Sequence, residues 1–154
     1  MYYTKSTHPG SIIRAGMDGS NPVTVITGLG NPHGIKIDLT TSKLFWTDYK
    51  TGRIESSNFQ GGDRRTVVQL SSERTRGIAI ADGRIYWGGE RSYKLESSTM
   101  TGEDIVTLHT ETESINQLAV VPDSSLLQNR TNDCEARRCE KVCVLTAASF
   151  RCLD

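Results

Sequence analysis

Short runs of alternating apolar and polar residues, separated by turn residues, recur along the first 120 positions of the chain. The clearest run is Lys43–Asp48, in which Leu44 and Trp46 alternate with Phe45 and Thr47. Aromatic and β-branched residues at every second position favour a β-strand. No segment keeps a helical period of 3.6 residues over three turns, so the pattern predicts an all-β chain.

The runs themselves repeat. Equivalent turns carry glycines 42 and 41 residues apart: Gly19, Gly61 and Gly102. Apolar residues keep the same steps: Ile12, Ile54 and Leu95. Each full unit holds four short runs, and its Gly-containing turn supplies the positive φ that a tight hairpin needs. Four antiparallel strands every ~40–45 residues are typical of a β-propeller blade.

The second unit resembles the YWTD repeat, also called the low-density-lipoprotein receptor class B repeat. The matching segments are Gly34–Asp38, Leu44–Asp48, Ile54–Phe59 and Arg64–Val68. The third unit keeps Tyr86-Trp87 but has Gly88-Gly89 where the repeat has threonine and aspartate, and the first unit keeps only Tyr3-Thr4. The expected fold is therefore a partial propeller of about three four-stranded antiparallel blades.

The expected domain boundaries follow the repeat. Residues 1–126 are expected to form the propeller, with blade units at about 1–28, 29–70 and 71–112 and a closing strand at 115–121.

The chain enters on the second strand of a blade and leaves on a first strand, which accounts for three blades, whereas the resemblance implies six. One hypothesis is that Met1 is an artificial start and that a signal peptide and earlier blades lie outside this sequence. A compact three-bladed domain is the alternative. Open blade edges would let the isolated chain associate.

A cysteine cluster marks the last part of the chain, residues 127–154, which we expect to form a linker and a truncated EGF-like module. All four cysteines lie there: Cys134, Cys139, Cys143 and Cys152. A clustered even set predicts disulfides and an oxidising compartment. A zinc site is the alternative, although the spacing has no C-x-x-C pair and no nearby histidine. Spacing alone leaves three connectivities. The resemblance to an EGF-like module implies Cys134–Cys143 and Cys139–Cys152. Asn129 begins a glycosylation sequon.

One set of loops is expected to share a face of the propeller, because antiparallel up-and-down strands place alternate turns on opposite faces. These loops are 30–33, 49–53, 71–76, 90–93 and 111–113, and they are rich in aromatic and charged residues. Tyr and Arg are favoured binding anchors. The predicted ligand-binding face consists of Tyr49, Lys50, Arg53, Arg74, Arg76, Arg91 and Tyr93. The alternative is that these loops are merely solvated.

A second set of residues has a structural interpretation. Large aromatic side chains favour packing between sheets over a role in a site, and this is the expectation for Trp46, Trp87, Phe45 and Tyr86. Asp48, Gly34 and Gly77 are expected to be structural positions of the repeat. For Asp48 the resemblance implies hydrogen bonds between blades rather than a role as a catalyst or a metal ligand.

Charge and motifs limit the function classes. Eighteen basic and eighteen acidic side chains cancel, which argues against nucleic acid or a membrane surface as partner. The positions that begin the inner strands show no catalytic constellation, and no cofactor or metal is predicted, which argues against a lactonase-like enzyme.

The resemblance implies a non-enzymatic extracellular or cell-surface module of a lipoprotein-receptor-related receptor, binding protein ligands for signalling or endocytosis. Any membrane attachment would come from missing parts of a parent receptor. The alternative is a nidogen-like basement-membrane module. Acid-triggered release through His8, His33 or His109 is a further hypothesis.

Overall fold

The fold was obtained as a computed structural model, which describes residues 1–70, 73–120, 142–145 and 150–153. The described part of the chain is built from strands, and it contains no helix with the length and apolar character needed to cross a bilayer. The strands are β1 (Tyr2–Lys5), β2 (Gly10–Arg14), β3 (Val23–Leu29), β4 (Pro32–Asp38), β5 (Lys43–Asp48), β6 (Arg53–Asn58), β7 (Arg65–Gln69), β8 (Ile78–Ala81), β9 (Arg84–Gly88), β10 (Lys94–Thr99), β11 (Val106–Thr110), β12 (Gln117–Val120), β13 (Val142–Leu145) and β14 (Phe150–Leu153).

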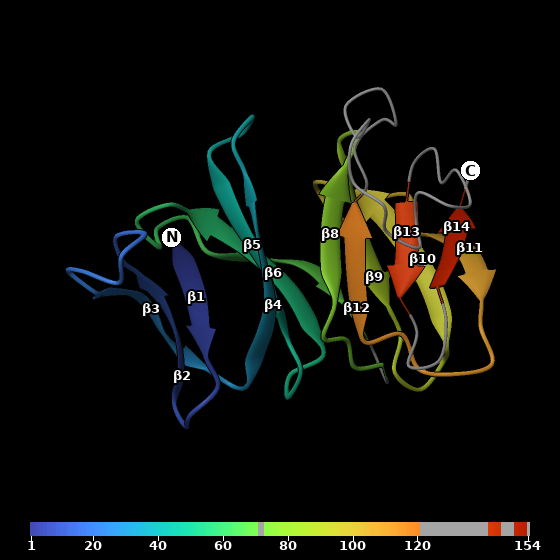
Figure 1. Cartoon of the computed structure of the whole chain (residues 1–154), viewed down its shortest axis with the longest axis horizontal. Helices are drawn as coiled ribbons and strands as arrows, with labels where there is room; N and C mark the ends of the chain where they lie inside the picture. The colour runs from blue at the N-terminus through green and yellow to red at the C-terminus, as the bar shows by residue number, and fades with distance from the viewer. Residues whose placement is uncertain (71–72, 121–141, 146–149, 154) are drawn as a thin grey trace.

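The strands form a row of antiparallel sheets in chain order, as Figure 1 shows. Blade 2 is the sheet β4-β5-β6-β7 and blade 3 is the sheet β8-β9-β10-β11. Blade 1 is the three-stranded sheet β1-β2-β3, in which β1 takes the place of a second strand. The predicted all-β fold with four-stranded antiparallel units of the propeller type is therefore confirmed. Blade 1 differs from blade 2 in that its sheet has no innermost strand among the described residues.

The strand expected to close the propeller has a different partner. β12 lies beside β8 and pairs with β13 rather than with β1. The physical reason is distance along the row: β1 belongs to blade 1, whereas β12 lies beside β8 of blade 3, on the far side of blade 2 (Figure 1). Among the described residues, β1 is therefore hydrogen-bonded to a partner strand, β2, along one edge alone.

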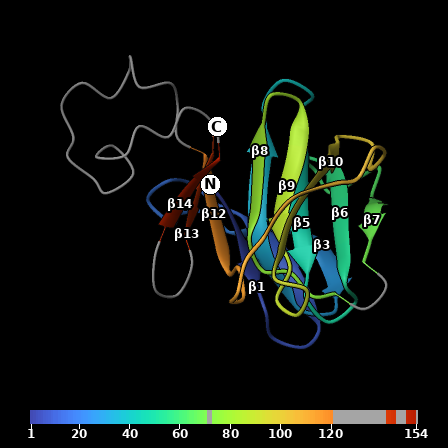
Figure 2. The same cartoon turned by 90° about the vertical axis from the view of Figure 1, so that its right-hand side faces the viewer.

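β12, β13 and β14 form a third kind of sheet, called here the tail sheet. Figure 2 shows it on one side of the blade 3 strands. Cys143 and Cys152 are cross-strand partners in its β13–β14 ladder. The other two cysteines, the predicted disulfides and Asn129 lie outside the described residues, and so does most of the expected EGF-like module.

The core lies between blades, because each blade buries an apolar face against the next. The cluster between blades 1 and 2 contains Ile12, Ile26, Leu29, Leu44 and Trp46. The cluster between blades 2 and 3 contains Phe45, Ile54, Val67, Val68, Ile78, Ile85 and Trp87. Trp46 and Trp87 are fully buried, and each packs against the blade that precedes its own. Burial of such large side chains is the main source of stability of the array.

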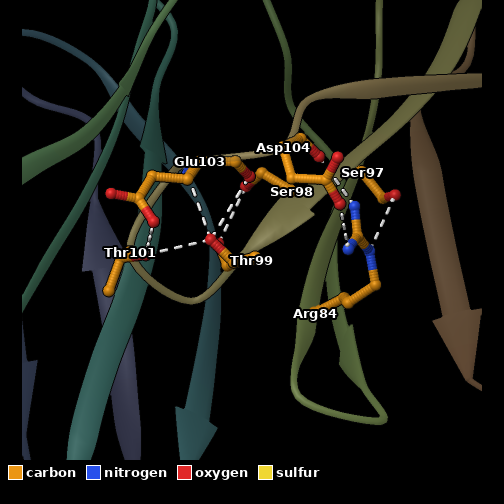
Figure 3. A network of polar contacts seen from close by, with 7 residues as sticks. All are labelled: Arg84, Ser97, Ser98, Thr99, Thr101, Glu103 and Asp104. Atoms are coloured by element: carbon orange, nitrogen blue, oxygen red, sulfur yellow. Dashed lines mark hydrogen bonds and ion pairs between the residues drawn. The ribbon is translucent and has the colours of Figure 1, made fainter.

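The same hairpin joins the third and fourth strands of every blade. Its glycine has φ of +81°, +86° or +91° in blades 1, 2 and 3, and the residue two positions later also has a positive φ. Figure 3 shows the copy in blade 3, where the Thr99 side chain bonds to Glu103 and Arg84 pairs with Asp104 at 2.9 Å. Each fourth strand then contains a β-bulge, which leaves one residue out of the ladder: Val25, Val67 or Leu108.

The hairpin glycine of one blade lies against the bulge of the preceding blade. A Cβ added at Gly61 would collide with the Val25 carbonyl oxygen, and one added at Gly102 would collide with the Val67 carbonyl oxygen. Two separate constraints therefore favour glycine at positions 61 and 102: the positive φ and the close approach of a backbone oxygen from the preceding blade. The hairpins thus fix the spacing between blades.

Candidate functional site

A cluster of aromatic and cationic side chains lies where the inner strands begin. Tyr49 follows β5, and His33 is the second residue of β4. Arg74 and Arg76 belong to the connection between blades 2 and 3. The guanidinium carbons of Arg74 and Arg76 lie 5.1 Å and 4.7 Å from the centre of the Tyr49 ring. The His33 ring meets Tyr49 edge-on at 5.6 Å. Cations at these distances from an aromatic face are attracted by its quadrupole, so the cluster is self-supporting.

The cluster opens onto a groove of about 790 Å³ between the starts of β4, β8 and β12. Its polar lining consists of His33, Lys36, Arg76, Glu90, Ser114, Asn116 and Gln117. Arg76 is exposed and lies 3.8 Å from the Glu90 carboxylate, which is a long ion pair between partly exposed groups. Such a pair is weak, so the Arg76 guanidinium remains able to bind another carboxylate.

Asp48 holds the loops of this face together from beneath the cluster. Its carboxylate accepts the backbone N–H of Gly30 at 2.7 Å and of Asn31 at 3.1 Å, both in the connection from blade 1. It also accepts the N–H groups of Lys50 and Thr51 in its own turn, both at 3.1 Å. Burial pushes the pKa of Asp48 upward, but the bonds from Gly30, Thr51 and Asn31 together outweigh burial and hold the pKa below its ordinary value.

Blade 3 has no acid at the matching position, because Gly89 replaces Asp48. There Glu73, from the connection between blades 2 and 3, supplies the carboxylate. It accepts the N–H groups of Arg91 at 2.8 Å and Ser92 at 2.7 Å, and that of Arg74 at 2.9 Å. Burial raises the pKa of Glu73, and these bonds, led by that from Arg91, outweigh burial and leave the pKa lowered.

In each blade the carboxylate comes from one of two facing backbone positions, and the other position is a glycine. Glu73 and Gly30 are equivalent positions 43 residues apart, and Gly89 and Asp48 are equivalent positions 41 residues apart. A Cβ at Gly30 would lie 2.8 Å from Asp48 Oδ1, and a Cβ at Gly89 would lie 3.0 Å from Glu73 Cδ. The pair is Gly–Asp in blade 2 and Glu–Gly in blade 3. Sequence analysis missed Glu73, although an alignment of the repeats shows an acid appearing opposite the position that lost one.

Threonine and glycine fix the inner strands beside the groove. The Thr47 hydroxyl accepts the Gly34 N–H at 3.0 Å and donates to the Arg76 carbonyl at 3.1 Å, while Thr4 donates to the His33 carbonyl at 2.9 Å. Side chains at Gly34 or Gly77 would meet the backbone of the next inner strand. The glycines therefore allow the close approach that brings His33 and Arg76 to one groove.

The electrostatics of His33 depend on the same neighbours. Burial lowers the pKa of His33, and the Arg76 charge lowers it further, against smaller opposing effects of Asp48 and Glu90. The imidazole is consequently held neutral to a lower pH than a free histidine.

The structure brings only part of the predicted face together. Tyr49, Arg74 and Arg76 form the cluster described above. Arg53 is exposed, and its guanidinium donates to the Gln69 side chain at 2.9 Å. The remaining three predicted residues are exposed on the neighbouring loops: Lys50, Arg91 and Tyr93. Tyr93 has a φ of +57° in the β9–β10 turn.

The residues with a predicted structural role lie in or beside the inter-blade packing. Trp46, Trp87 and Phe45 are buried, and Tyr86 is partly buried against the cluster that contains Leu95 and Ile115. Gly88 leaves room for Ile115, because a Cβ there would collide with that side chain. Within the described residues, no three His, Cys, Asp or Glu side chains are grouped so as to hold a metal ion.

Comparison with known families identifies the repeat unit. Residues 42–80 match the low-density lipoprotein receptor repeat class B. This class B segment contains Trp46, Asp48 and Tyr49, and it extends through Glu73, Arg74 and Arg76 to the start of β8.

Similar proteins include two receptors. The chain is 28% identical to low-density lipoprotein receptor-related protein 5 of Homo sapiens over 144 residues, which are 92% of this chain and 9% of the receptor. It is 30% identical to the vitellogenin receptor of Solenopsis invicta over 153 residues, which are 97% of this chain and 8% of that receptor. The chain thus spans less than a tenth of either relative.

Solved structures share the fold. A chain of a nidogen/laminin complex has a TM-score of 0.75 at 28% identity, over 95% of this chain and 52% of that one. A luciferin-regenerating enzyme has a TM-score of 0.64 at 14% identity, over 94% of this chain and 54% of that one. The second likeness shows the fold alone. The chain spans about half the length of both.

Proposed function

We propose that the chain is an extracellular, non-enzymatic protein-binding module and that its partner docks on the loop face around Tyr49, Arg74 and Arg76. The observation that carries this proposal is the Tyr49 ring, flanked by two guanidinium groups at the mouth of a polar groove. Rigid blades hold these loops in place, and loops on a rigid scaffold commonly carry binding function. The two receptor relatives and the nidogen/laminin neighbour support protein binding over catalysis.

The chemistry of the face favours an acidic segment of the partner. Arg74, Arg76 and Lys36 are cationic, while Glu90 is the one acid that lines the groove among the described residues. An arginine guanidinium binds a carboxylate with two parallel hydrogen bonds, and its stacking on Tyr49 pre-orients the fork. An aspartate or glutamate of the partner would displace Glu90 from Arg76.

Receptor and matrix roles remain distinct forms of this proposal. The receptor form, supported by the two receptor relatives, is a segment of a lipoprotein-receptor-related protein that binds ligands for signalling or endocytosis. The matrix form, supported by the nidogen/laminin neighbour, is a basement-membrane interaction module. Uptake of a labelled binder by cells that express the parent protein would favour the receptor form, and retention of the parent in extracellular matrix would favour the other.

The tail is part of the same proposal. We place residues 127–154 as a linker and truncated EGF-like module with disulfides Cys134–Cys143 and Cys139–Cys152 and a glycan on Asn129. Mass spectrometry of the protein secreted from animal cells, before and after glycosidase and reduction, tests the glycan and both bridges.

A screen of an array of secreted proteins and receptor ectodomains tests the binding proposal. Wild-type chain should retain specific binders, and Arg76→Glu should lose them because it places repulsion at the groove mouth. Arg65→Glu is the matched control, since Arg65 is an exposed arginine on the outer strand β7, and it should bind like wild type. Binders that ignore Arg76→Glu, or an array without any binder, would contradict the proposal.

A further inference from the structure

Two turns on the loop face carry basic residues at matching positions of the repeat. These turns join β5 to β6 in blade 2 and β9 to β10 in blade 3. Lys50 and Arg91 are equivalent positions 41 residues apart, and Arg53 and Lys94 are related by the same step. All four side chains belong to exposed residues. The repeat therefore places pairs of cations in register on successive blades.

The connection between blades 2 and 3 lies against both of these turns. The Leu70 N–H donates to the Gly52 carbonyl at 2.9 Å, and the Glu90 N–H donates to the Arg74 carbonyl at 3.0 Å. This connection adds Arg74 and Arg76 to the four cations of the turns. The six side chains form one row across the loop face, called here the basic stripe: Lys50, Arg53, Arg74, Arg76, Arg91 and Lys94.

The acids near the basic stripe are turned inward or engaged. Six basic and three acidic side chains lie in the stretches that contain the stripe: 48–53, 73–76 and 89–94. Asp48 is 2% exposed and accepts four backbone N–H groups. Glu73 is partly buried and accepts three. Glu90 is the third acid, and it makes the long pair with Arg76 at 3.8 Å. Solvent at the stripe therefore meets mainly cations.

The turns of the opposite face carry the opposite charge. Five acids and one base occupy these turns: 15–22, 39–42, 59–64, 82–83 and 100–105. The base, Arg64, pairs with Glu55 at 2.9 Å. On the loop face, Glu111 and Glu113 in the connection after β11 mark the end of the stripe. The zero net charge of the chain thus hides a polarity between its faces, which would steer a polyanion to the stripe.

We propose that the basic stripe binds a sulfated glycosaminoglycan chain of the cell surface or extracellular matrix, an inference that rests on the extracellular placement in the proposed function. A linear chain with a sulfate on many of its sugars can set successive anions on the blade 2 turn, the connection and the blade 3 turn. Arginine and lysine bind sulfate oxygens as they bind phosphate, and clustered basic side chains are typical of heparin-binding patches. Each exposed ion pair is weak and is screened by salt, so affinity comes from several pairs at once.

Heparin-affinity chromatography of the full chain tests the proposal. Wild type should be retained at about 0.15 M salt, and chemically desulfated heparin should not retain it. Lys50→Ser/Arg91→Ser should elute at lower salt and bind a heparin oligosaccharide about fivefold more weakly, because two ion pairs are lost. Arg14→Ser/Arg65→Ser is the matched control. It removes the same charge from exposed strand ends beside the opposite turns, and it should elute like wild type.

A second pair of equivalent residues repeats the test. Arg53→Ser/Lys94→Ser should also elute at lower salt than the control. The substituted residues are exposed, so the variants should keep their fold, which circular dichroism checks. A wild-type chain that passes heparin unretained, equal elution of stripe and control variants, or equal retention on desulfated heparin would overturn the proposal. Binding to phosphatidylserine vesicles as tight as binding to heparin would overturn it as well, because the stripe would then recognise a membrane surface.

The protein array separates this inference from the proposed function. A protein binder that depends on Arg76 should still bind Lys50→Ser/Arg91→Ser, since neither substituted residue lines the groove. Heparin retention without any array binder would contradict the proposed function alone. Array binders without heparin retention would contradict the glycan-binding stripe alone.

Discussion

At the residue scale, one carboxylate per connection holds the loop face in shape. In blade 2 it is Asp48, which reaches the N–H groups of Gly30 and Asn31. In blade 3 it is Glu73, which reaches the N–H groups of Arg91 and Ser92 from the opposite backbone segment. The carboxylate oxygens of Asp48 and Glu73 accept N–H groups at equivalent positions of the two loops. The loops therefore need a carboxylate at that point in space, and either of two positions of the repeat can supply it.

Moving the blade 3 carboxylate from position 73 to position 89 tests this account. Glu73→Gly should lower the free energy of unfolding by about 2 kcal/mol, because three N–H groups lose a charged acceptor. Gly89→Asp alone should also destabilise, since the new side chain would meet Glu73 and repel its charge. The double variant Glu73→Gly/Gly89→Asp recreates the arrangement of blade 2 and should recover most of the loss. Urea unfolding measures all three, and additive losses in the double variant would contradict the account.

The lowered pKa of His33 predicts a pH dependence of stability. The unfolded chain protonates His33 near its ordinary pKa of 6.5, whereas the folded protein resists protonation. The unfolded state therefore binds more protons as pH falls below about 6.5, and folding stability should decrease from pH 7.5 to pH 5. His33→Gln should weaken that decrease in urea unfolding curves recorded at both pH values. An unchanged pH dependence in His33→Gln would show that other groups are responsible.

At the element scale, the blades could be predicted because local patterns agree with the global fold. Alternation in residues 43–48 and the repeated glycine turns were enough to predict four-stranded antiparallel units. Contacts that join distant segments were harder. Tyr49 and Arg76 meet only because the connection between blades 2 and 3 folds back over the end of β5, and no local pattern encodes that path. The pairing of β12 with β13 was missed for the same reason.

The hairpin glycines give a prediction with an internal control. Gly19, Gly61 and Gly102 all have a positive φ, so replacement by alanine costs about 1 kcal/mol at each position. Gly61→Ala and Gly102→Ala should cost at least about 1–2 kcal/mol more, because the new Cβ collides with the preceding blade. Urea unfolding of the three variants and the wild type measures the difference. Equal losses at all three positions would show that the hairpins do not set the spacing of the blades.

At the scale of the whole molecule, the blades form a rigid row whose inner strands begin along one edge, the lower edge in Figure 1. The cluster of Tyr49, Arg74 and Arg76 lies on this edge, while the β4–β5 and β8–β9 hairpins lie on the opposite edge. The proposed docking surface for a partner protein is therefore the loop face, and the opposite hairpins lie outside it.

Hydrogen exchange of the chain bound to a protein recovered from the array tests the central claim most directly. If the loop face is the docking surface, bound partner should slow amide exchange in residues 30–33, 49–53 and 73–76. Exchange in the opposite hairpins, residues 39–42 and 82–83, should stay unchanged, and these hairpins serve as the control within the same experiment. Protection confined to those hairpins or to the outer strands β7 and β11 would contradict the claim.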